Sequence, residues 1–337
     1  MAPPYFSVVI DNYNYGRYIG QAIDGILAQT FPASEVETVV VDDGSTDDSR
    51  EVVARYGDKV RLVAKKNAGQ AAAFKTGFEA ARGQVICLLD SDDYWEPDKL
   101  SAVADKLKDP SIGIVQHYLR DVDAENRPLA NPLPDWPEAY SLEDFLAGDF
   151  VNGATSGMAL RRSVLDQVLP VPNDIFWLYD DYLFDHGLFV SRIGNIPRIL
   201  GYHRIHGANN WAMGYLNPVK LEGTIDHLRR FRAYIEPKLR ERGLKFSDRY
   251  DAVWNLDIAK REVLLAMQRG QRRAAFGKWR ALMSRYGATG LGCFRGATLA
   301  LALVSPALYF KAYELYERLQ LLVRARQRLL PEPGAVK

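Results

Sequence analysis

Apolar residues in the first ninety positions gather in four short runs, each followed by a polar turn. The runs lie at residues 6–10, 36–41, 59–64 and 85–89. Between them, apolar side chains recur at helical spacing, as in Ile19, Ala22, Ile23 and Ile26. The run at 85–89 has no polar residue, which is typical of a strand that is covered on both faces. Four strand–helix repeats with short loops therefore predict an α/β fold with a Rossmann-like, mostly parallel sheet and flanking helices.

The pattern changes twice further along the chain. Residues 97–108 predict a helix, 112–119 a strand, 121–137 a hairpin and loop, 152–160 a strand, and 195–202 another extended segment. Residues 217–330 read as helical, with amphipathic stretches near 228–239, 253–267 and 276–286. We expect a catalytic domain at 1–216, made of halves 1–95 and 96–216, and a helical C-terminal region at 217–337.

Three of the four predicted strands end in acidic residues. These are Asp11, the pair Asp42 and Asp43, and the cluster Asp90-Ser91-Asp92-Asp93. Parallel strands place these exits at one edge of the sheet, where open α/β sheets bind ligands. Three carboxylates within four residues repel one another, and a hard divalent cation with oxygen ligands would relieve that repulsion. The alternative is a solvated acidic loop that caps the helix beginning near Pro97.

Alternation along a strand exit predicts that Asp90 and Asp92 share one direction and that Asp93 points elsewhere unless the loop curls. No strand exit carries a Gly-x-Gly-x-x-Gly or Walker-type phosphate loop. This absence argues against a dinucleotide dehydrogenase and a P-loop nucleotidase, and a phosphate bound here would need a metal.

The composition of the 337 residues, 47 % hydrophobic and 25 % charged, is that of an ordinary globular protein. Cys87 and Cys293 form no metal-ligand or disulfide pattern, and the N-terminus lacks a signal-peptide layout, so we expect a cytoplasmic protein. The net charge of +1 hides an asymmetry: residues 217–337 hold 24 Lys and Arg against 11 Asp and Glu, and residues 1–216 hold 19 against 31.

The assembled motifs resemble those of inverting glycosyltransferase family 2, nucleotide-sugar enzymes with the GT-A fold. They are Ser-Val-Val-Ile-x-x-Tyr-Asn at 7–14, Val-Asp-Asp-Gly-Ser-Thr-Asp at 41–47, Asn-x-Gly at 67–69, Asp-Ser-Asp-Asp at 90–93, Asp-Asp at 180–181 and Tyr-x-Arg-x-His at 202–206. The resemblance covers about residues 5–211. The chain departs from the family at Asp11-Asn12, where Pro-Thr is frequent, and at Phe74-Lys75, where Arg-Asn is common.

The resemblance implies a donor site at the strand exits. Tyr13 would stack on the nucleotide base, Asp43 would accept a hydrogen bond from the uracil imide or a ribose hydroxyl, and Asn67 and Gly69 would lie under the ribose and base. Asp11 is a further donor-contact candidate at the first strand exit.

The metal site implied by the resemblance holds Mg²⁺ or Mn²⁺. Asp92 would be its first ligand, Asp90 would contact the ribose or the metal, and His206 would be a third ligand. Asp181 matches the position of the base that deprotonates the acceptor hydroxyl during inversion, with Asp180 as the substitute or as a group that orients the acceptor.

The expected partners are a nucleoside diphosphate sugar, UDP- or GDP-linked, and a glycan or lipid-linked saccharide acceptor. A sugar nucleotidyltransferase and a degenerate nucleotide-sugar-binding module are the alternatives. The apolar segment 297–310 and the aromatic, basic segment 309–328 suit an inner membrane surface, a core helix or a homodimer interface. No nucleic-acid module is recognisable, so we expect no nucleic-acid partner.

Overall fold

The computed structural model describes residues 3–129, 133–172, 179–206, 217–288, 290–305, 308, 309 and 311. The chain divides into two compact units, one of residues 1–129 and 133–209 and one of residues 130–132 and 210–337. The boundary expected after residue 216 falls within a segment outside the described residues.

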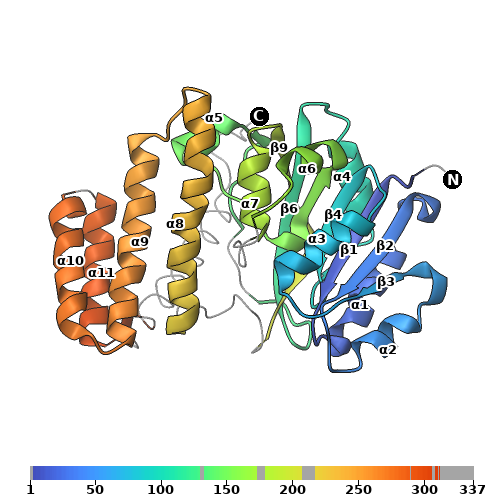
Figure 1. Ribbon diagram of the computed structural model, residues 1–337, viewed down its shortest axis with the longest axis horizontal. Helices are drawn as coiled ribbons and strands as arrows, with labels where there is room; N and C mark the ends of the chain where they lie inside the picture. Colours follow the sequence, from blue (N-terminus) through green and yellow to red (C-terminus); the bar gives the residue numbers. More distant parts are fainter. Residues whose placement is uncertain are drawn as a thin grey trace, which may run out of the picture. The chain divides into compact units, whose positions relative to one another are not determined.

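The first unit begins with the four expected strand–helix repeats (Figure 1). These elements are β1 (Phe6–Asn12), α1 (Gly16–Leu27), β2 (Val36–Asp42), α2 (Ser49–Ala54), β3 (Arg61–Ala64), α3 (Gln70–Ala80) and β4 (Val85–Asp90). Short 3₁₀ turns precede β2 at Ala33–Glu35 and β3 at Gly57–Lys59. The four strands pair in parallel in the order β3-β2-β1-β4.

The second half of this unit makes the sheet mixed. Its elements are β5 (Tyr94–Trp95), α4 (Lys99–Lys106), β6 (Ile112–Asp123), β7 (Ala139–Tyr140), α5 (Leu142–Ala147), β8 (Met158–Arg161), α6 (Arg162–Val168), α7 (Tyr179–Gly187) and β9 (Arg192–Ile205). The sheet continues from β4 through β8, β6 and β9 to β5, and β7 pairs with β9. Strand β8 runs antiparallel to both β4 and β6, whereas β6 and β9 are parallel.

Helices cover both faces of the sheet, as predicted. Val8 and Ile10 of β1 share a buried cluster with Ile19 and Ile23 of α1. On the opposite face α3 packs against β1 and β2, and a Cβ added to Gly77 would lie 2.2 Å from Val9 Cγ1. Helix α7 lies on the α3 side, because Tyr179 stacks on Phe74 of α3 with ring centroids 6.0 Å apart. The α/β fold with flanking helices predicted from the sequence is therefore confirmed.

The segment 152–160, predicted as a strand, is only partly one. A 3₁₀ turn occupies Thr155–Gly157, and β8 begins at Met158. The Cβ of a residue replacing Gly157 would lie 2.9 Å from the His117 carbonyl oxygen, so the turn packs directly on β6. This turn places polar side chains at the sheet edge where β4 ends.

The described part of the second unit is helical. It consists of α8 (Pro218–Glu241), α9 (Asp248–Gln268), α10 (Arg272–Tyr286) and α11 (Gly290–Val304), and α9 packs against each of the other three. None of the described helices is long and apolar enough to cross a membrane. Most of the aromatic, basic segment 309–328 lies outside the described residues.

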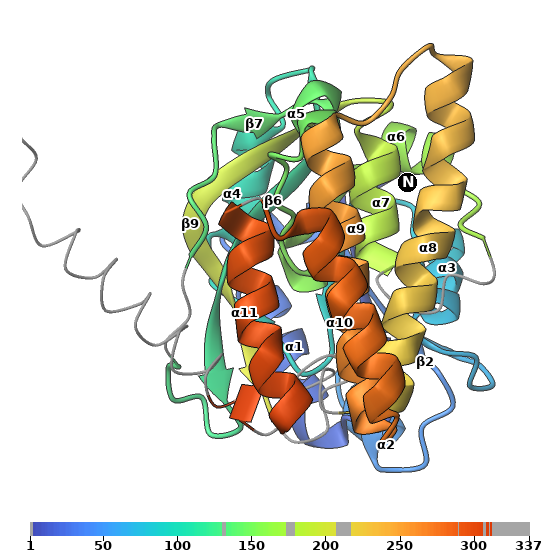
Figure 2. The ribbon, with the colours of Figure 1, turned by 90° about the vertical axis from the view of Figure 1, so that its left-hand side faces the viewer.

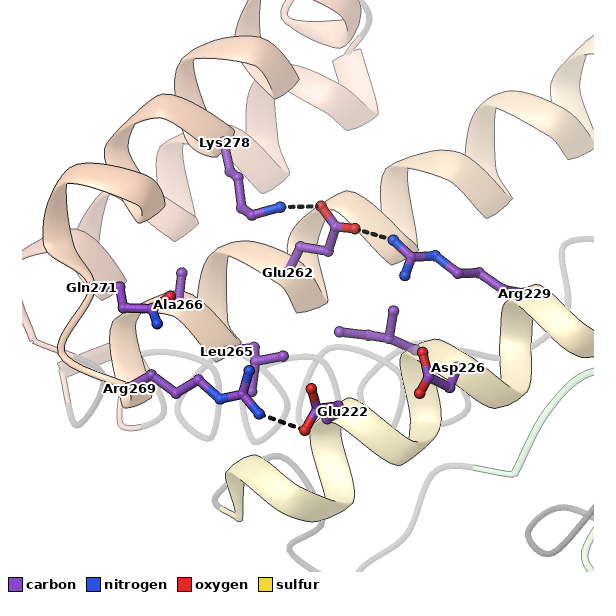
Figure 3. A pocket seen from close by; sticks show the side chains of 10 residues that line it. Glu222, Asp226, Arg229, Glu262, Leu265, Ala266, Arg269, Gln271 and Lys278 are labelled. Carbon is purple, nitrogen blue, oxygen red and sulfur yellow. Dashed lines mark hydrogen bonds and ion pairs between the residues drawn. The ribbon is translucent and has the colours of Figure 1, made fainter.

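Ion pairs join the helices of the second unit around a shallow pocket of about 190 Å³ (Figure 3). Glu262 of α9 binds Arg229 of α8 and, at 2.8 Å, Lys278 of α10. Glu222 of α8 binds Arg269, just after α9. Because these charges neutralise one another, we interpret the pocket as a junction between helices.

Candidate functional site

The acidic cluster after β4 lies in a tight turn. The Asp93 amide donates to the Asp90 carbonyl oxygen at 3.1 Å, which closes the turn. Asp90, Asp92 and Asp93 each contribute a carboxylate oxygen to a group in which all three atoms lie within 4.8 Å of one another. The loop therefore curls, which is the exception to the expected alternation, and the closed turn brings Asp93 to the side of Asp90 and Asp92.

Hydrogen bonds to the protein occupy both oxygens of Asp93. Ser156 Oγ donates to Oδ2 at 2.6 Å, and the Arg204 amide donates to Oδ1 at 2.9 Å. Burial raises the pKa of Asp93 to about 7, although the nearby charge of His203 lowers it. Asp93 thus ties the turn to the 3₁₀ turn at Thr155–Gly157 and to β9, and its oxygens are less available to a cation than those of its neighbours.

Arg204 is the buried support of this turn. Its side chain is 1 % exposed, and its Nε donates to the Asp92 carbonyl oxygen at 2.8 Å. The guanidinium lies 4.6 Å from the Tyr18 ring centroid, and Nη2 donates to Gln21 Oε1 at 2.8 Å. The sequence placed Arg204 in the Tyr-x-Arg-x-His motif but gave it no role. The structure shows that it fixes the Asp92 backbone.

Asp92 and His206 form the centre of the candidate metal site. His206 Nε2 lies 3.0 Å from Asp92 Oδ2, and both side chains are less than one-tenth exposed. The imidazole stacks on Tyr18 and meets the edge of Tyr15, with ring centroids 5.1 and 5.4 Å away. The two residues come from the ends of β4 and β9, which the fold brings together across 114 positions of sequence. A carboxylate and an imidazole held at this distance suit a divalent cation between them.

Asp90 is joined to the first strand. It pairs in register with Asp11, and Gln70 Nε2 donates to Asp90 Oδ1 at 3.0 Å. Burial and the charge of Asp92 raise the pKa of Asp11 to about 7, although its hydrogen bond to Asp90 lowers it. Burial and the charge of Asp11 also raise the pKa of Asp90. The two neighbouring carboxyl groups are therefore protonated more readily than exposed ones.

Asp43 clamps the loop at residues 65–69. Its carboxylate accepts hydrogen bonds from Lys65 Nζ at 2.5 Å, the Ala68 amide at 3.0 Å and the Gly69 amide at 2.7 Å. Gly44 has φ +83°, and a Cβ there would lie 2.8 Å from the Asn67 amide nitrogen. The predicted donor residues Asp43, Asn67 and Gly69 are therefore brought together.

The neighbouring Asp42 holds the turn after β1. It accepts from Asn12 Nδ2 at 3.1 Å and from Arg50 Nε at 2.6 Å. Asn14, at φ 59°, accepts from the Thr46 amide at 2.7 Å. These bonds hold the turn that carries Tyr13, whose side chain is 46 % exposed.

The acid pair at residues 180 and 181 opens α7. Thr155 Oγ1 donates to Asp180 Oδ2 at 2.9 Å, and Asn152 Nδ2 donates to Asp181 Oδ1. Burial and the charge of Asp180 raise the pKa of Asp181 well above its usual range. Sequence reasoning missed Asn152 and Thr155, because a segment expected to be a strand gave no reason to aim their side chains at α7.

A divalent cation fits the donor set at the end of β4. Asp92 and His206 are its best-placed ligands, and Asp90 lies close enough to add an oxygen. The mixture of carboxylate and imidazole excludes neither Mg²⁺ nor Mn²⁺.

Comparison with known proteins agrees with this arrangement. Residues 7–169 match the family model described as glycosyl transferase family 2. A relative from Nostoc sp., an uncharacterized glycosyltransferase, is 37 % identical over 216 residues, which are 60 % of this chain and 66 % of the relative. The chain thus spans just under two thirds of that relative's length.

Two solved structures share the fold. The mannosyltransferase PcManGT of Pyrobaculum calidifontis, in complex with GDP-Man and Mn²⁺, has a TM-score of 0.56 and 18 % identity, and the match covers 96 % of this chain and 88 % of that one. S. aureus TarS 1–349, in complex with UDP-GlcNAc, has a TM-score of 0.54 and 18 % identity, with 85 % and 92 % covered. The family match at residues 7–169 and the Nostoc relative confirm the predicted resemblance to glycosyltransferase family 2, and the two solved structures confirm the fold.

Proposed function

We propose that this protein transfers a sugar, with inversion, from a UDP- or GDP-linked donor to a hydroxyl of a glycan or lipid-linked saccharide. The observation that supports this most strongly is the Asp92–His206 pair at 3.0 Å. It lies in the same unit as a loop clamped by Asp43 and as a buried Asp181. The complexes of the two solved neighbours, with GDP-Man and Mn²⁺ and with UDP-GlcNAc, support a metal-bound nucleotide sugar as donor.

In this proposal the base, the ribose and the diphosphate of the donor each contact a different group of residues. The base stacks on the exposed ring of Tyr13, and the ribose lies over the loop that contains Asn67 and Gly69. Asp92 and His206, with Asp90, hold Mg²⁺ or Mn²⁺. The cation when bound supplies Lewis-acid stabilisation of the negative charge that develops on the leaving diphosphate.

Asp181 is the proposed general base. A carboxylate with a raised pKa is a better proton acceptor than an exposed one, and burial together with Asp180 provides that shift. The Asn152 amide fixes one Asp181 oxygen, which leaves the other to take the proton of the acceptor hydroxyl. Asp180, held by Thr155, orients the pair and adds the charge that keeps Asp181 basic.

The test separates donor binding from transfer. With a donor that the enzyme uses, Asp181→Asn should bind donor and Mn²⁺ with unchanged affinity but lose transfer about 100-fold or more. Asp166→Asn, an exposed aspartate on α6, is the matched control and should leave both unchanged. Transfer by Asp181→Asn at the wild-type rate would contradict the base assignment.

A sugar nucleotidyltransferase and a degenerate binding module give different results in the same experiment. A nucleotidyltransferase would join a sugar phosphate to a nucleoside triphosphate and release pyrophosphate. A degenerate binding module would bind the donor without turnover. Release of a nucleoside diphosphate that depends on acceptor supports the transferase.

The site of action is the remaining part of the proposal. We propose that the protein works in the cytoplasm as a peripheral protein at the inner membrane face, where a lipid-linked acceptor would be available. The basic C-terminal region supports a membrane location. A homodimer formed through that region is the alternative.

A further inference from the structure

A long stretch of the second unit contains no acidic residue. Between Glu262 and Glu314 the sequence runs for 51 residues with eight Lys and Arg and neither Asp nor Glu. This stretch forms the end of α9 and all of α10 and α11. Figure 2 shows α10 and α11 side by side, and both pack on α9.

Helix α11 is apolar on its outer side as well as its inner side. Leu299 and Ala302 face inward and are fully buried. Leu301, Val304 and Leu308 are 40 %, 68 % and 49 % exposed. Phe294, 46 % exposed, and Leu301 and Val304 are spaced by two turns and one turn, so they form one stripe along α11, and Leu308 follows after the helix ends at Val304. A helix that is apolar on all sides is normally buried by protein or lipid on all sides.

Exposed cations lie on the neighbouring helix α10 and just after α11. Arg272, Arg273, Arg280 and Arg285 of α10 are exposed, and none has a carboxylate partner within the described part of the chain. By contrast, Lys278 of the same helix is neutralised by Glu262 in the junction between helices (Figure 3). Lys311, also exposed, lies after the end of α11.

We propose that the outer face of α10 and α11 binds an anionic membrane surface. The stripe from Phe294 to Val304, with Leu308 beyond it, would enter the boundary between headgroups and acyl chains, and the four arginines would meet lipid phosphates. If this face paired with the same face of a second copy, the arginines of the two copies would meet and repel one another. This repulsion argues against a dimer formed through the face. A nucleic-acid backbone would use the arginines but not the apolar stripe.

The first experiment is vesicle flotation with the full chain. Vesicles of phosphatidylcholine with about one-third phosphatidylglycerol should carry the protein, vesicles of phosphatidylcholine alone should not, and added salt should weaken binding. Arg272→Glu with Arg273→Glu should lower the partition coefficient about tenfold or more. Arg55→Glu, a single charge reversal at an exposed arginine of the first unit, is the control and should change nothing.

The apolar part of the proposal has its own variants. Leu301→Asp with Val304→Asp should also lower binding about tenfold, because charged groups would enter the boundary layer. Val219→Asp, on α8 with a 74 % exposed side chain, is the matched control. Circular dichroism and thermal melting of each variant check that the helices remain folded.

The exposed thiol of Cys293 reports the contact directly. The other cysteine, Cys87, is fully buried, so a polarity-sensitive fluorophore will label Cys293 beside Phe294. Its emission should shift to the blue with anionic vesicles and remain unchanged with neutral ones.

Three results would overturn the proposal. The first is failure of the protein to float with anionic vesicles. The second is equal flotation of the wild type and both double variants. The third is a dimer in solution that Leu301→Asp with Val304→Asp dissociates, together with no binding to vesicles. The last result would assign the face to a second copy of the chain.

Discussion

Replacement of Asp43 by asparagine tests the loop on which the proposed donor site depends. The Asp43 side chain is 4 % exposed, and its partners are an ammonium group and two amides, all of which can only donate. An asparagine keeps one acceptor oxygen but turns an NH₂ group toward at least one of these donors. The variant must therefore lose a charge-assisted hydrogen bond and gain an unfavourable contact.

The size of the effect follows from these contacts. A hydrogen bond to a charged group contributes about 1.5–3 kcal/mol, and the misplaced NH₂ group adds to the loss, so we expect a destabilisation of about 2–4 kcal/mol. For a unit of this size, that corresponds to a fall in Tm of about 4–16 °C. Below the melting range, the loosened loop of Asn67 and Gly69 should weaken donor binding about tenfold while leaving acceptor KM unchanged.

Thermal unfolding and donor titration together are the assay. Asp58→Asn, an exposed aspartate between α2 and β3, is the control and should change stability by less than about 0.5 kcal/mol. A variant as stable as wild type would refute the clamp. A large fall in Tm with unchanged donor affinity would show that the loop is structural and does not bind donor.

Three further predictions concern stability. Burial lowers the pKa of His203, but the hydrogen bond to Asp121 and the charges of Asp93, Asp121 and Asp92 together raise it to about 9. These contacts should stabilise the fold by about 1–2 kcal/mol below pH about 6.5 and lose that effect as pH rises through about 9, so Asp121→Asn should weaken this pH dependence in denaturant titrations. Gly44→Ala should lower stability by about 1–3 kcal/mol, because its φ is +83° and the new Cβ would meet the loop backbone; an unchanged Tm would contradict this. Burial lowers the pKa of Lys99, so relative to Lys99→Met the wild type should gain stability as pH rises toward about 10.5, and a pH-independent difference would argue against it.

Much of the first unit could be predicted because its signals are local. Short, mainly apolar segments identified β1 to β4, and the acids at the ends of β1, β2 and β4 converge because parallel strands share an edge. Asp11 and Asp90 are direct neighbours in register, as that reasoning requires. In the second unit, apolar spacing placed the stretches 228–239, 253–267 and 276–286 inside α8, α9 and α10.

What could not be predicted depends on turns and on contacts between distant residues. The turn that closes at Asp93 reverses the alternation expected for β4, and nothing in Asp-Ser-Asp-Asp distinguishes a turn from an extended exit. The antiparallel strand β8 is too short, at four residues, to show its direction in the sequence. The support that Arg204 gives to Asp92 joins positions more than a hundred residues apart, and only the folded sheet brings them together.

Nucleoside diphosphate release from a panel of UDP- and GDP-sugars, with Mn²⁺ and with a chelator, tests the central claim most directly. We predict that one donor is turned over with Mn²⁺, that the chelator abolishes release, and that Asp92→Asn and His206→Gln each reduce it about 100-fold or more while Asp166→Asn does not. Release that is equal with and without metal, or full activity of Asp92→Asn, would contradict a metal-dependent transferase built on the Asp92–His206 pair.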